Sequence, residues 1–404
     1  MIELNSLIKF LNDSPSSYHT IRNVSEIIRD KLSVSDEIKI GNTIIFTKST
    51  IDGATLVAFR ICKEINNPKI KVISSHADSP WFKVNSLDEF NKCNLSLART
   101  EKYGSPILSS WYDRPITLAG RVVYNDESVE LIHLKDKTFM IPNLCSHFSR
   151  YIEDDSLIKA GNPVLGTKSS VVSLLKETLG EKYNDIKEYS LSFINKEEPI
   201  IWGDDNEYLS APRLDNLASV YTSLVAFINS NDDKAINCLY ISDNEEIGSN
   251  TDVGAYDEFF KESLVKVCDA LGLNYESTIA KSFMISSDNA QGANPYFEYV
   301  FNPDYKVYLN NGIVIKNSER YSTTPASQEK MIKICNKANK KCQIYYNRSD
   351  IRGGGTIGTI VTSIVPIESV DVGIAQLAMH SSFETIGTKD IADTIELFTY
   401  FYNN

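Results

Sequence analysis

The hydrophobic and polar positions of the chain alternate between two patterns, one typical of helices and one typical of buried strands. Apolar residues recur at helical spacing in 3–12, 17–32, a segment that begins near 210–216, 256–271, 328–339 and 390–401. Short apolar runs of strand length occur at 43–47, 54–61, 70–75, 237–241, 282–287, 313–315, 343–346 and 370–373. This alternation predicts an α/β domain in which helices flank a mixed sheet.

The pattern changes in the middle of the chain. Between residues 84 and 207, short apolar runs such as 118–124 and 189–194 are separated by turn residues. We therefore expect a β-rich insert at 84–207 that interrupts a discontinuous domain made of residues 1–83 and 208–404.

Two of the predicted strands run directly into side chains that can bind metal ions or protons. The strand 70–75 is followed by His76, and the strand 237–241 is followed by Glu245 and Glu246. Ligands of open α/β sheets bind outside the carboxyl ends of the strands, so these side chains are expected to face a cleft. Taken alone, such an acidic turn is more often a solvated surface feature.

Three further residues stand at comparable places. Asp215 begins a helix, Asp288 ends the strand 282–287, and His380 follows the strand 370–373. Each has an ordinary structural explanation, as a helix cap, a turn residue or a buried core histidine.

Considered together, these side chains predict a metal centre. Carboxylates that converge at one edge of a sheet repel each other and require cations, and histidine with carboxylate ligands favours zinc, or cobalt or manganese. A shared aspartate between two metals about 3.5–4 Å apart is a common hydrolase arrangement. Two dications, three carboxylates and one hydroxide balance in charge, which leaves one glutamate free to accept a proton.

Composition and charge narrow the class of protein. The 404 residues are 42% hydrophobic and carry a net charge of −12, with no stripe of Lys and Arg, which argues against nucleic acid or an anionic membrane as partner. The chain has no run of 18 apolar residues and begins without a secretory leader pattern. Its seven cysteines are scattered without metal-ligand spacing. We expect a cytoplasmic protein with reduced thiols.

The order of the motifs adds a resemblance to a known family. The segments HADSP (76–80), PRLDNL (212–217), DNEEIGS (243–249), MISSD (284–288) and QLAMHS (376–381) resemble those of the aspartyl aminopeptidase family of dinuclear zinc metallopeptidases. In the insert, SWYDR (110–114) and LAGRV (118–122) match as well, so the resemblance spans nearly the whole chain.

The resemblance implies a function for each of the polar strand-end residues. It assigns two zinc ions per subunit, one held by His76, Asp215 and Asp288, the other by Asp215, Glu246 and His380.

Three further features follow from the same resemblance. Glu245 would be the general base that activates the water, and Asp78 would orient His76 through its other ring nitrogen. A cis peptide bond is expected between Asp215 and Asn216.

The resemblance also implies an assembly. His147 matches a histidine that family members insert into a neighbouring subunit's active site, where it stabilises the developing oxyanion. A homo-oligomer is therefore expected, with dimers assembled into a dodecamer that admits peptides and excludes folded proteins.

The substrate-binding positions are less regular. Lys316, Tyr321, Gln291 and Asp288 fall on or near positions that contact substrate in the family. Gln291 replaces a histidine, and a glutamine cannot carry charge, so the first residue of the substrate could be acidic or neutral. Arg352 stands where the family has a different residue and could enter the pocket or pair with a surface acid.

Two alternatives stay open at this point. The same metal pair serves carboxypeptidases and N-acyl amidohydrolases, and a carboxypeptidase would use an arginine such as Arg352 to bind the terminal carboxylate. A non-catalytic oligomeric shell protein is the third class, although such a protein would be expected to lose the base or a ligand.

Overall fold

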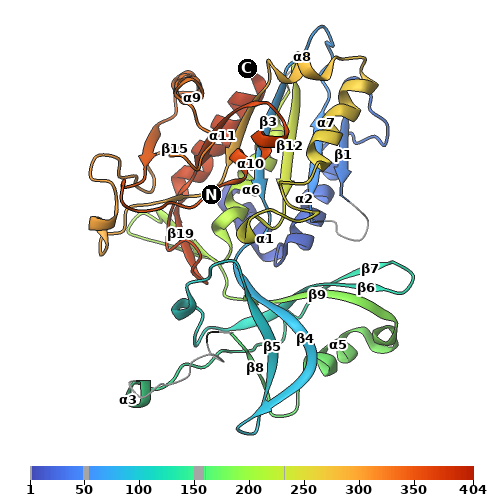
Figure 1. The fold of residues 1–404 in the computed structure, drawn as a ribbon, viewed down its shortest axis with the longest axis vertical. Helices are drawn as coiled ribbons and strands as arrows, with labels where there is room; N and C mark the ends of the chain where they lie inside the picture. Colours follow the sequence, from blue (N-terminus) through green and yellow to red (C-terminus); the bar gives the residue numbers. More distant parts are fainter. Residues whose placement is uncertain (1, 49–53, 150–158, 160, 232) are drawn as a thin grey trace.

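The structure, a computed structural model, describes residues 2–48, 54–149, 159, 161–231 and 233–404 (Figure 1). Its largest sheet has eight strands in the order β1-β2-β12-β3-β13-β17-β15-β16. Their bounds, in that order, are Thr43–Thr47, Leu56–Arg60, Ile236–Ser242, Ile70–His76, Phe283–Ser287, Glu368–Gly373, Ile313–Asn317 and Cys342–Tyr346. The four central strands β12, β3, β13 and β17 are parallel, whereas β2 and β15 pair with them antiparallel. The sheet is mixed, as predicted.

Helices cover both faces of this sheet (Figure 1). Alternate strand residues point to opposite faces, so Ile73 packs in a core with the first group of helices and Val72 in a core with the second. The first group is α1 (Ile2–Asp13), α2 (Ser17–Lys31), α6 (Leu214–Asn229), α9 (Pro325–Lys337) and α11 (Thr388–Asn403). The second is α7 (Phe259–Ala270), α8 (Tyr275–Ile279) and α10 (Ile357–Ile364). The sequence pattern did not reveal α10, because it directly follows a glycine run.

A smaller five-stranded sheet adjoins the large sheet near the carboxyl ends of its parallel strands. Its order is β10-β11-β19-β18-β14, with bounds Ile200–Trp202, Tyr208–Ala211, Glu384–Gly387, Ala375–Leu377 and Ala290–Gln291. Strand β11 leads directly into α6, and β18 leads into the turn that carries His380. This sheet therefore brings two chain segments with predicted ligands to the same place.

The middle of the chain forms a sheet of its own, with a separate hydrophobic core. Its order is β7-β6-β9-β4-β5-β8, with bounds Val129–His133, Ile116–Tyr124, Ile186–Asn195, Trp81–Lys92, Leu95–Tyr103 and Val164–Gly166. One helix, α5 (Val171–Leu179), packs on it and begins with a capping box at Ser170 and Ser173. The predicted fold class is thus confirmed. The division at residues 84 and 207 stays a prediction, and this sheet runs from Trp81 to Asn195.

Within the described part of the chain, the remaining short elements include α3 (Ser146–Ser149) and the 3₁₀ turn η3 (Glu245–Ile247), which follows β12. In Figure 1, α3 lies at the far end of the insert, away from the large sheet. Among the described residues, no helix is both long and apolar enough to cross a bilayer.

Candidate metal centre

The candidate site lies at the carboxyl edge of the parallel strands. His76 is the last residue of β3 and pairs in register with Ser242, the last residue of β12. Asp288 follows β13 directly. The topology therefore places three strand ends side by side, as the sequence pattern predicted.

Asp215 reaches the same edge through an irregular helix start. Asp215 and Asn216 have non-helical backbone angles in the first turn of α6, and the peptide bond between them is cis, as the resemblance implied. Asn216 donates a hydrogen bond from Nδ2 to the Ser287 carbonyl at 3.0 Å, and Ser79 donates from Oγ to the Asp215 carbonyl at 2.6 Å. These bonds attach the start of α6 to β13 and to the segment after β3.

The structure brings the predicted ligands into two groups that share Asp215. In the first, Nε2 of His76 lies 3.6 Å from Oδ1 of Asp215 and 3.5 Å from Oδ1 of Asp288. In the second, Nε2 of His380 lies 3.7 Å from Oδ2 of Asp215 and 3.3 Å from Oε2 of Glu246. The potential ligand atoms within each group lie within 4.8 Å of one another. Each oxygen of Asp215 thus faces a different group.

The donor set is suited to metal ions. Oδ1 of Asp215 and Oε1 of Glu246 are buried without a hydrogen-bond partner, which is costly for a carboxylate unless a cation is present. Burial, with the nearby charge of Asp288, raises the pKa of Asp215 to about 7. Burial and the neighbouring Asp215 raise the pKa of Glu246 well above its ordinary value. The geometry and chemistry of both groups fit zinc, with a mixture of imidazole and carboxylate donors.

Asp288 is compensated by a cation of the protein. Burial alone would raise the pKa of Asp288, but Lys316, whose Nζ lies 3.2 Å from Oδ2, and His76 lower it. Lys316 is itself only 3% exposed, and its ammonium lies 5.6 Å from the centre of the Tyr321 ring. Neither Lys316 nor Tyr321 is among the described residues that line the cleft. Their predicted contact with substrate stays a prediction.

Asp78 connects the metal-binding edge to the glutamate turn. Its Oδ1 lies 3.3 Å from Nδ1 of His76, as predicted, and its carboxylate accepts hydrogen bonds from the backbone N–H groups of Glu245 and Glu246 at 3.1 Å. The hydroxyl group of Tyr103, in the insert, donates a hydrogen bond to Oδ2 of Asp78 at 2.7 Å. Burial alone would lower the pKa of His76, but Asp288 and Asp78 raise it well above its ordinary value.

Glu245 stands beside the two groups and belongs to neither. One carboxylate oxygen lies 4.0 Å from Nε2 of His76, and the side chain is 19% exposed, so it faces the cleft. Burial raises the pKa of Glu245 to about 8, against the opposing effect of His76. The group can therefore exchange protons near neutral pH.

Some contributors to the site were not predicted. Glu384, which is 1% exposed, accepts hydrogen bonds from the backbone N–H groups of Asp215 at 3.0 Å and His380 at 2.7 Å. It thereby fixes two of the predicted ligands. Tyr103 also went unnoticed. Both residues occur within ordinary strand patterns, and nothing in their local sequence marks them.

The cleft in front of the metal groups has a volume of about 710 Å³, enough for a peptide end. Its wall includes the predicted Gln291, and also Glu319, Arg320 and Ile360, which were not predicted. Arg352 is exposed and does not line this cleft. Of the described residues that line this cleft, Arg320 is therefore the one arginine or lysine.

His147 lies in α3 and is exposed, remote from the metal groups of its own chain (Figure 1). Its neighbours Leu144 and Phe148 are 44% and 61% exposed. A single chain thus leaves this apolar arm uncovered.

The comparisons with known proteins agree with this geometry. Residues 10–402 match the family described as aminopeptidase I zinc metalloprotease (M18). A probable M18 family aminopeptidase 2 of Clostridium acetobutylicum is 32% identical over 424 aligned positions, which cover 98% of each chain.

Solved structures match over nearly the whole chain. Ape4 in its complex with Nbr1 is 25% identical, with a TM-score of 0.90 over 99% of this chain and 85% of that one. The mApe1 dodecamer of S. cerevisiae is 20% identical, with a TM-score of 0.84 over 98% of this chain and 95% of that one. The family match and the identity to the clostridial relative are decisive: this chain belongs to the M18 family of zinc aminopeptidases.

Proposed function

We propose that this zinc aminopeptidase holds two zinc ions per chain and removes single residues from peptide N-termini, with Glu245 as general base. The observation that carries the proposal is the position of Asp215, whose two carboxylate oxygens each face a separate His–carboxylate group. A carboxylate in this position fits a bridge between two metals.

In this proposal His76, Asp215 and Asp288 hold one ion, and Asp215, Glu246 and His380 hold the other. Zinc held by these residues would lower the pKa of a water molecule and would polarise the scissile carbonyl. Cobalt or manganese would suit the same ligands. Asp78 and Glu384 keep the ligands in place, because each accepts hydrogen bonds from the backbone beside them.

Glu245 would move the proton. Its carboxylate borders the cleft and has no role in either ligand group, so it is free to accept a proton from the attacking water. It then donates the proton to the departing amine of the peptide. Burial raises the pKa of Glu245 above its ordinary value, which makes its carboxylate a stronger base than that of an exposed glutamate.

Arg320 supports an acidic first residue over a neutral one. Its guanidinium group is the charged donor on the cleft wall, where Gln291 adds an amide that can donate a hydrogen bond. Lys316 pairs with Asp288, which leaves Arg320 better suited to bind a substrate carboxylate.

An alternative function uses the same arginine. If Arg320 binds the terminal carboxylate of a peptide, the enzyme would act as a carboxypeptidase, and N-acylated substrates would be cleaved. The aminopeptidase reaction is favoured because the chain belongs to a family of aminopeptidases.

We also propose that the active unit is a homo-oligomer, with dimers assembled into a dodecamer. The exposed apolar side chains of Leu144 and Phe148 beside His147 support an arm that packs on a second subunit. His147 would then stabilise the oxyanion in the partner's cleft. All seven cysteines are unpaired, which supports a reducing location such as the cytoplasm.

Glu245→Gln tests the proton-transfer role. We expect kcat for aminoacyl arylamides to fall about 10²–10⁴-fold, because glutamine cannot accept the proton, while the zinc content stays at two ions per chain. Glu319→Gln, which changes a carboxylate elsewhere on the cleft wall, serves as the matched control and should retain activity. Equal rates in Glu245→Gln and the unsubstituted enzyme would contradict the mechanism, and cleavage of N-acetylated substrates would favour the alternative.

Metal binding should determine how stability depends on pH. Without metal, the raised pKa values of Asp215 (about 7) and Glu245 (about 8) mean that the folded chain binds more protons than the unfolded chain between roughly pH 4 and pH 8. Its Tm should therefore fall as the pH rises through this window. Zinc replaces those protons, so the gain in Tm on adding zinc should grow between pH 5 and pH 8.

Thermal unfolding of chelated and zinc-loaded protein at several pH values measures this difference. Asp215→Asn removes the shared carboxylate and should flatten the pH dependence. A zinc-induced gain that is constant across the range, or present in full in Asp215→Asn, would argue against the proposed ligands.

Arg320→Met tests the preference for the first residue. We expect kcat/KM for an N-terminal Asp or Glu arylamide to fall about 10- to 100-fold, because a charged hydrogen bond contributes about 1.5–3 kcal/mol. Activity on a Leu arylamide should change little. Arg352→Met is the matched control, since Arg352 lies outside the cleft wall. If both arylamides lose activity equally in Arg320→Met, the residue has another role.

His147→Ala tests whether one subunit completes the site of another. Alone, the variant should retain its assembly state and lose about 100-fold in kcat, as expected for the loss of an oxyanion donor. Mixed and reassembled with Glu245→Gln chains, it should recover about one quarter of the original activity, because random pairing makes half of the dimers mixed and each has one complete site. No recovery in the mixed assembly would show that His147 does not act across subunits.

A further inference from the structure

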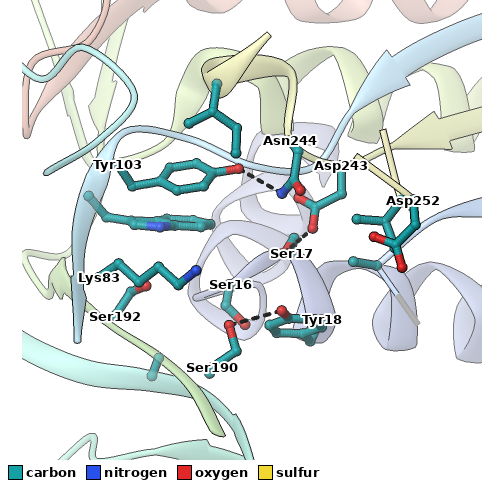
Figure 2. Close-up of a pocket in the computed structure, with 16 residues that line it drawn as sticks. Ser16, Ser17, Tyr18, Lys83, Tyr103, Ser190, Ser192, Asp243, Asn244 and Asp252 are labelled. Atoms are coloured by element: carbon teal, nitrogen blue, oxygen red, sulfur yellow. Dashed lines mark hydrogen bonds between the residues drawn. The ribbon is translucent and has the colours of Figure 1, made fainter. Parts of the chain in front are cut away.

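A second cavity, of about 180 Å³, is lined in part by Asp243, Asn244 and Ile247, next to the turn that carries Glu245 and Glu246 (Figure 2). It shares no lining residue with the active-site cleft. Its walls include the start of α2, Ala54 before β2, the insert strands β4, β5, β6 and β9, and the segment after β12. The cavity therefore lies where the insert meets the helices of the large sheet.

One wall carries a buried carboxylate with an unused oxygen. Asp243 is 3% exposed, and its Oδ2 accepts a hydrogen bond from the Ser17 hydroxyl at 3.2 Å. Its Oδ1 is buried and has no hydrogen-bond partner. A buried carboxylate oxygen without a hydrogen bond is destabilising, and a hydrogen bond from a cationic donor would compensate it best.

The facing wall carries an unpaired ammonium group. Figure 2 shows the Lys83 side chain extending into the cavity from the side opposite Asp243. Among the described residues, the Lys83 side chain has no ion pair or hydrogen bond, and Lys83 and Asp243 do not pair with each other. The cavity thus presents an ammonium group and a carboxyl group across an open space, and Asp252 also lines it. Burial raises the pKa of Asp243 well above its ordinary value, so a cationic ligand beside it would stabilise its ionised form.

The remaining walls offer hydroxyl groups and an aromatic surface. Ser16 and Ser192 line the cavity near Lys83 (Figure 2). The rings of Trp81 and Tyr103 are stacked, with centroids 5.1 Å apart, and form an apolar side. The start of the 15-residue helix α2, with its positive dipole end, also borders the space.

We propose that this cavity binds a small zwitterion, a free α-amino acid. Lys83 and the serine hydroxyls would bind its carboxylate, Oδ1 of Asp243 would accept from its ammonium group, and its side chain would pack on Trp81. The size agrees, because a cavity of about 150 Å³ accommodates benzene, which has as many non-hydrogen atoms as alanine. An inorganic ion alone would leave one of the two charges uncompensated.

Occupation of this cavity would reach the metal centre through two hydrogen bonds. Asn244, on the cavity wall, donates from Nδ2 to the Tyr103 hydroxyl at 2.8 Å, and Tyr103 donates to Asp78 at 2.7 Å. Asp78 contacts His76 and fixes the backbone of Glu245 and Glu246. A free amino acid is also the product that an aminopeptidase releases. Regulation of the metal centre by this ligand therefore rests on the proposed function.

Titration calorimetry of the zinc-loaded full chain with alanine tests the binding. We expect a saturable event that Lys83→Met and Asp243→Asn each weaken at least about tenfold. Alaninamide, which lacks the carboxylate, and N-acetylalanine, which lacks the ammonium group, should lose this event. Lys102→Met, a change of an exposed lysine on β5, is the matched control and should bind alanine normally.

Arylamide hydrolysis in the presence of alanine supplies the second measurement. The change in kcat that alanine causes should disappear in Lys83→Met, while competitive inhibition by alanine at the active site, seen as a change in KM, should stay. Among the described residues, the Lys83 side chain has no hydrogen bond or ion pair that the substitution would remove. Alanine binding that is unchanged in Lys83→Met, or matched by ammonium chloride or sodium acetate alone, would overturn the proposal. Lys83-dependent binding without any hydrolysis would support the cavity and count against the proposed function.

Discussion

Repulsion among buried carboxylates is the constraint on which the site depends. Asp215 lies in one group with Asp288 and in another with Glu246, at the end of a hydrophobic sheet where burial weakens the screening of their charges. The protein compensates Asp288 internally through Lys316 and His76. It leaves Asp215 and Glu246 with uncompensated oxygens. This difference marks those two carboxylates as the ones that depend most on metal ions.

Two further acids at the same edge, Asp78 and Glu384, have carboxylates that accept hydrogen bonds from the backbone. Asp78 accepts from the backbone of Glu245 and Glu246, and Glu384 accepts from the backbone of Asp215 and His380. Their lone pairs are used by N–H groups, which makes them supports for neighbouring ligands. The chemistry of the site thus follows from which carboxylates the backbone satisfies and which it does not. Because Tyr103 of the insert bonds to Asp78, the insert takes part in this arrangement.

The sequence predicted the parts of this arrangement that depend on strand ends. An apolar run that stops at His76 or before Glu245 shows where a buried strand meets the catalytic edge, since the parallel β12, β3 and β13 end together. The pattern did not predict Glu384, Tyr103 or Arg320. Glu384 and Tyr103 act through contacts that are distant in sequence, and Arg320 reaches the cleft wall only through the fold; local periodicity contains no information about either. Similarly, α10 follows a glycine run whose turn chemistry concealed the helix.

The division of labour between the two adjacent glutamates follows from the short turn that carries them. In a 3₁₀ turn, successive side chains point about 120° apart, so Glu245 and Glu246 cannot face the same place. Asn244 and Gly248, both with left-handed backbone angles, close the turn immediately on either side. The Glu246 side chain is consequently 3% exposed and lies with His380, whereas the Glu245 side chain is 19% exposed and borders the cleft. A strand at this point would instead point the two glutamates to opposite faces of the sheet. The brief turn is therefore what would allow one glutamate to serve as a ligand and its neighbour to exchange protons, as we propose.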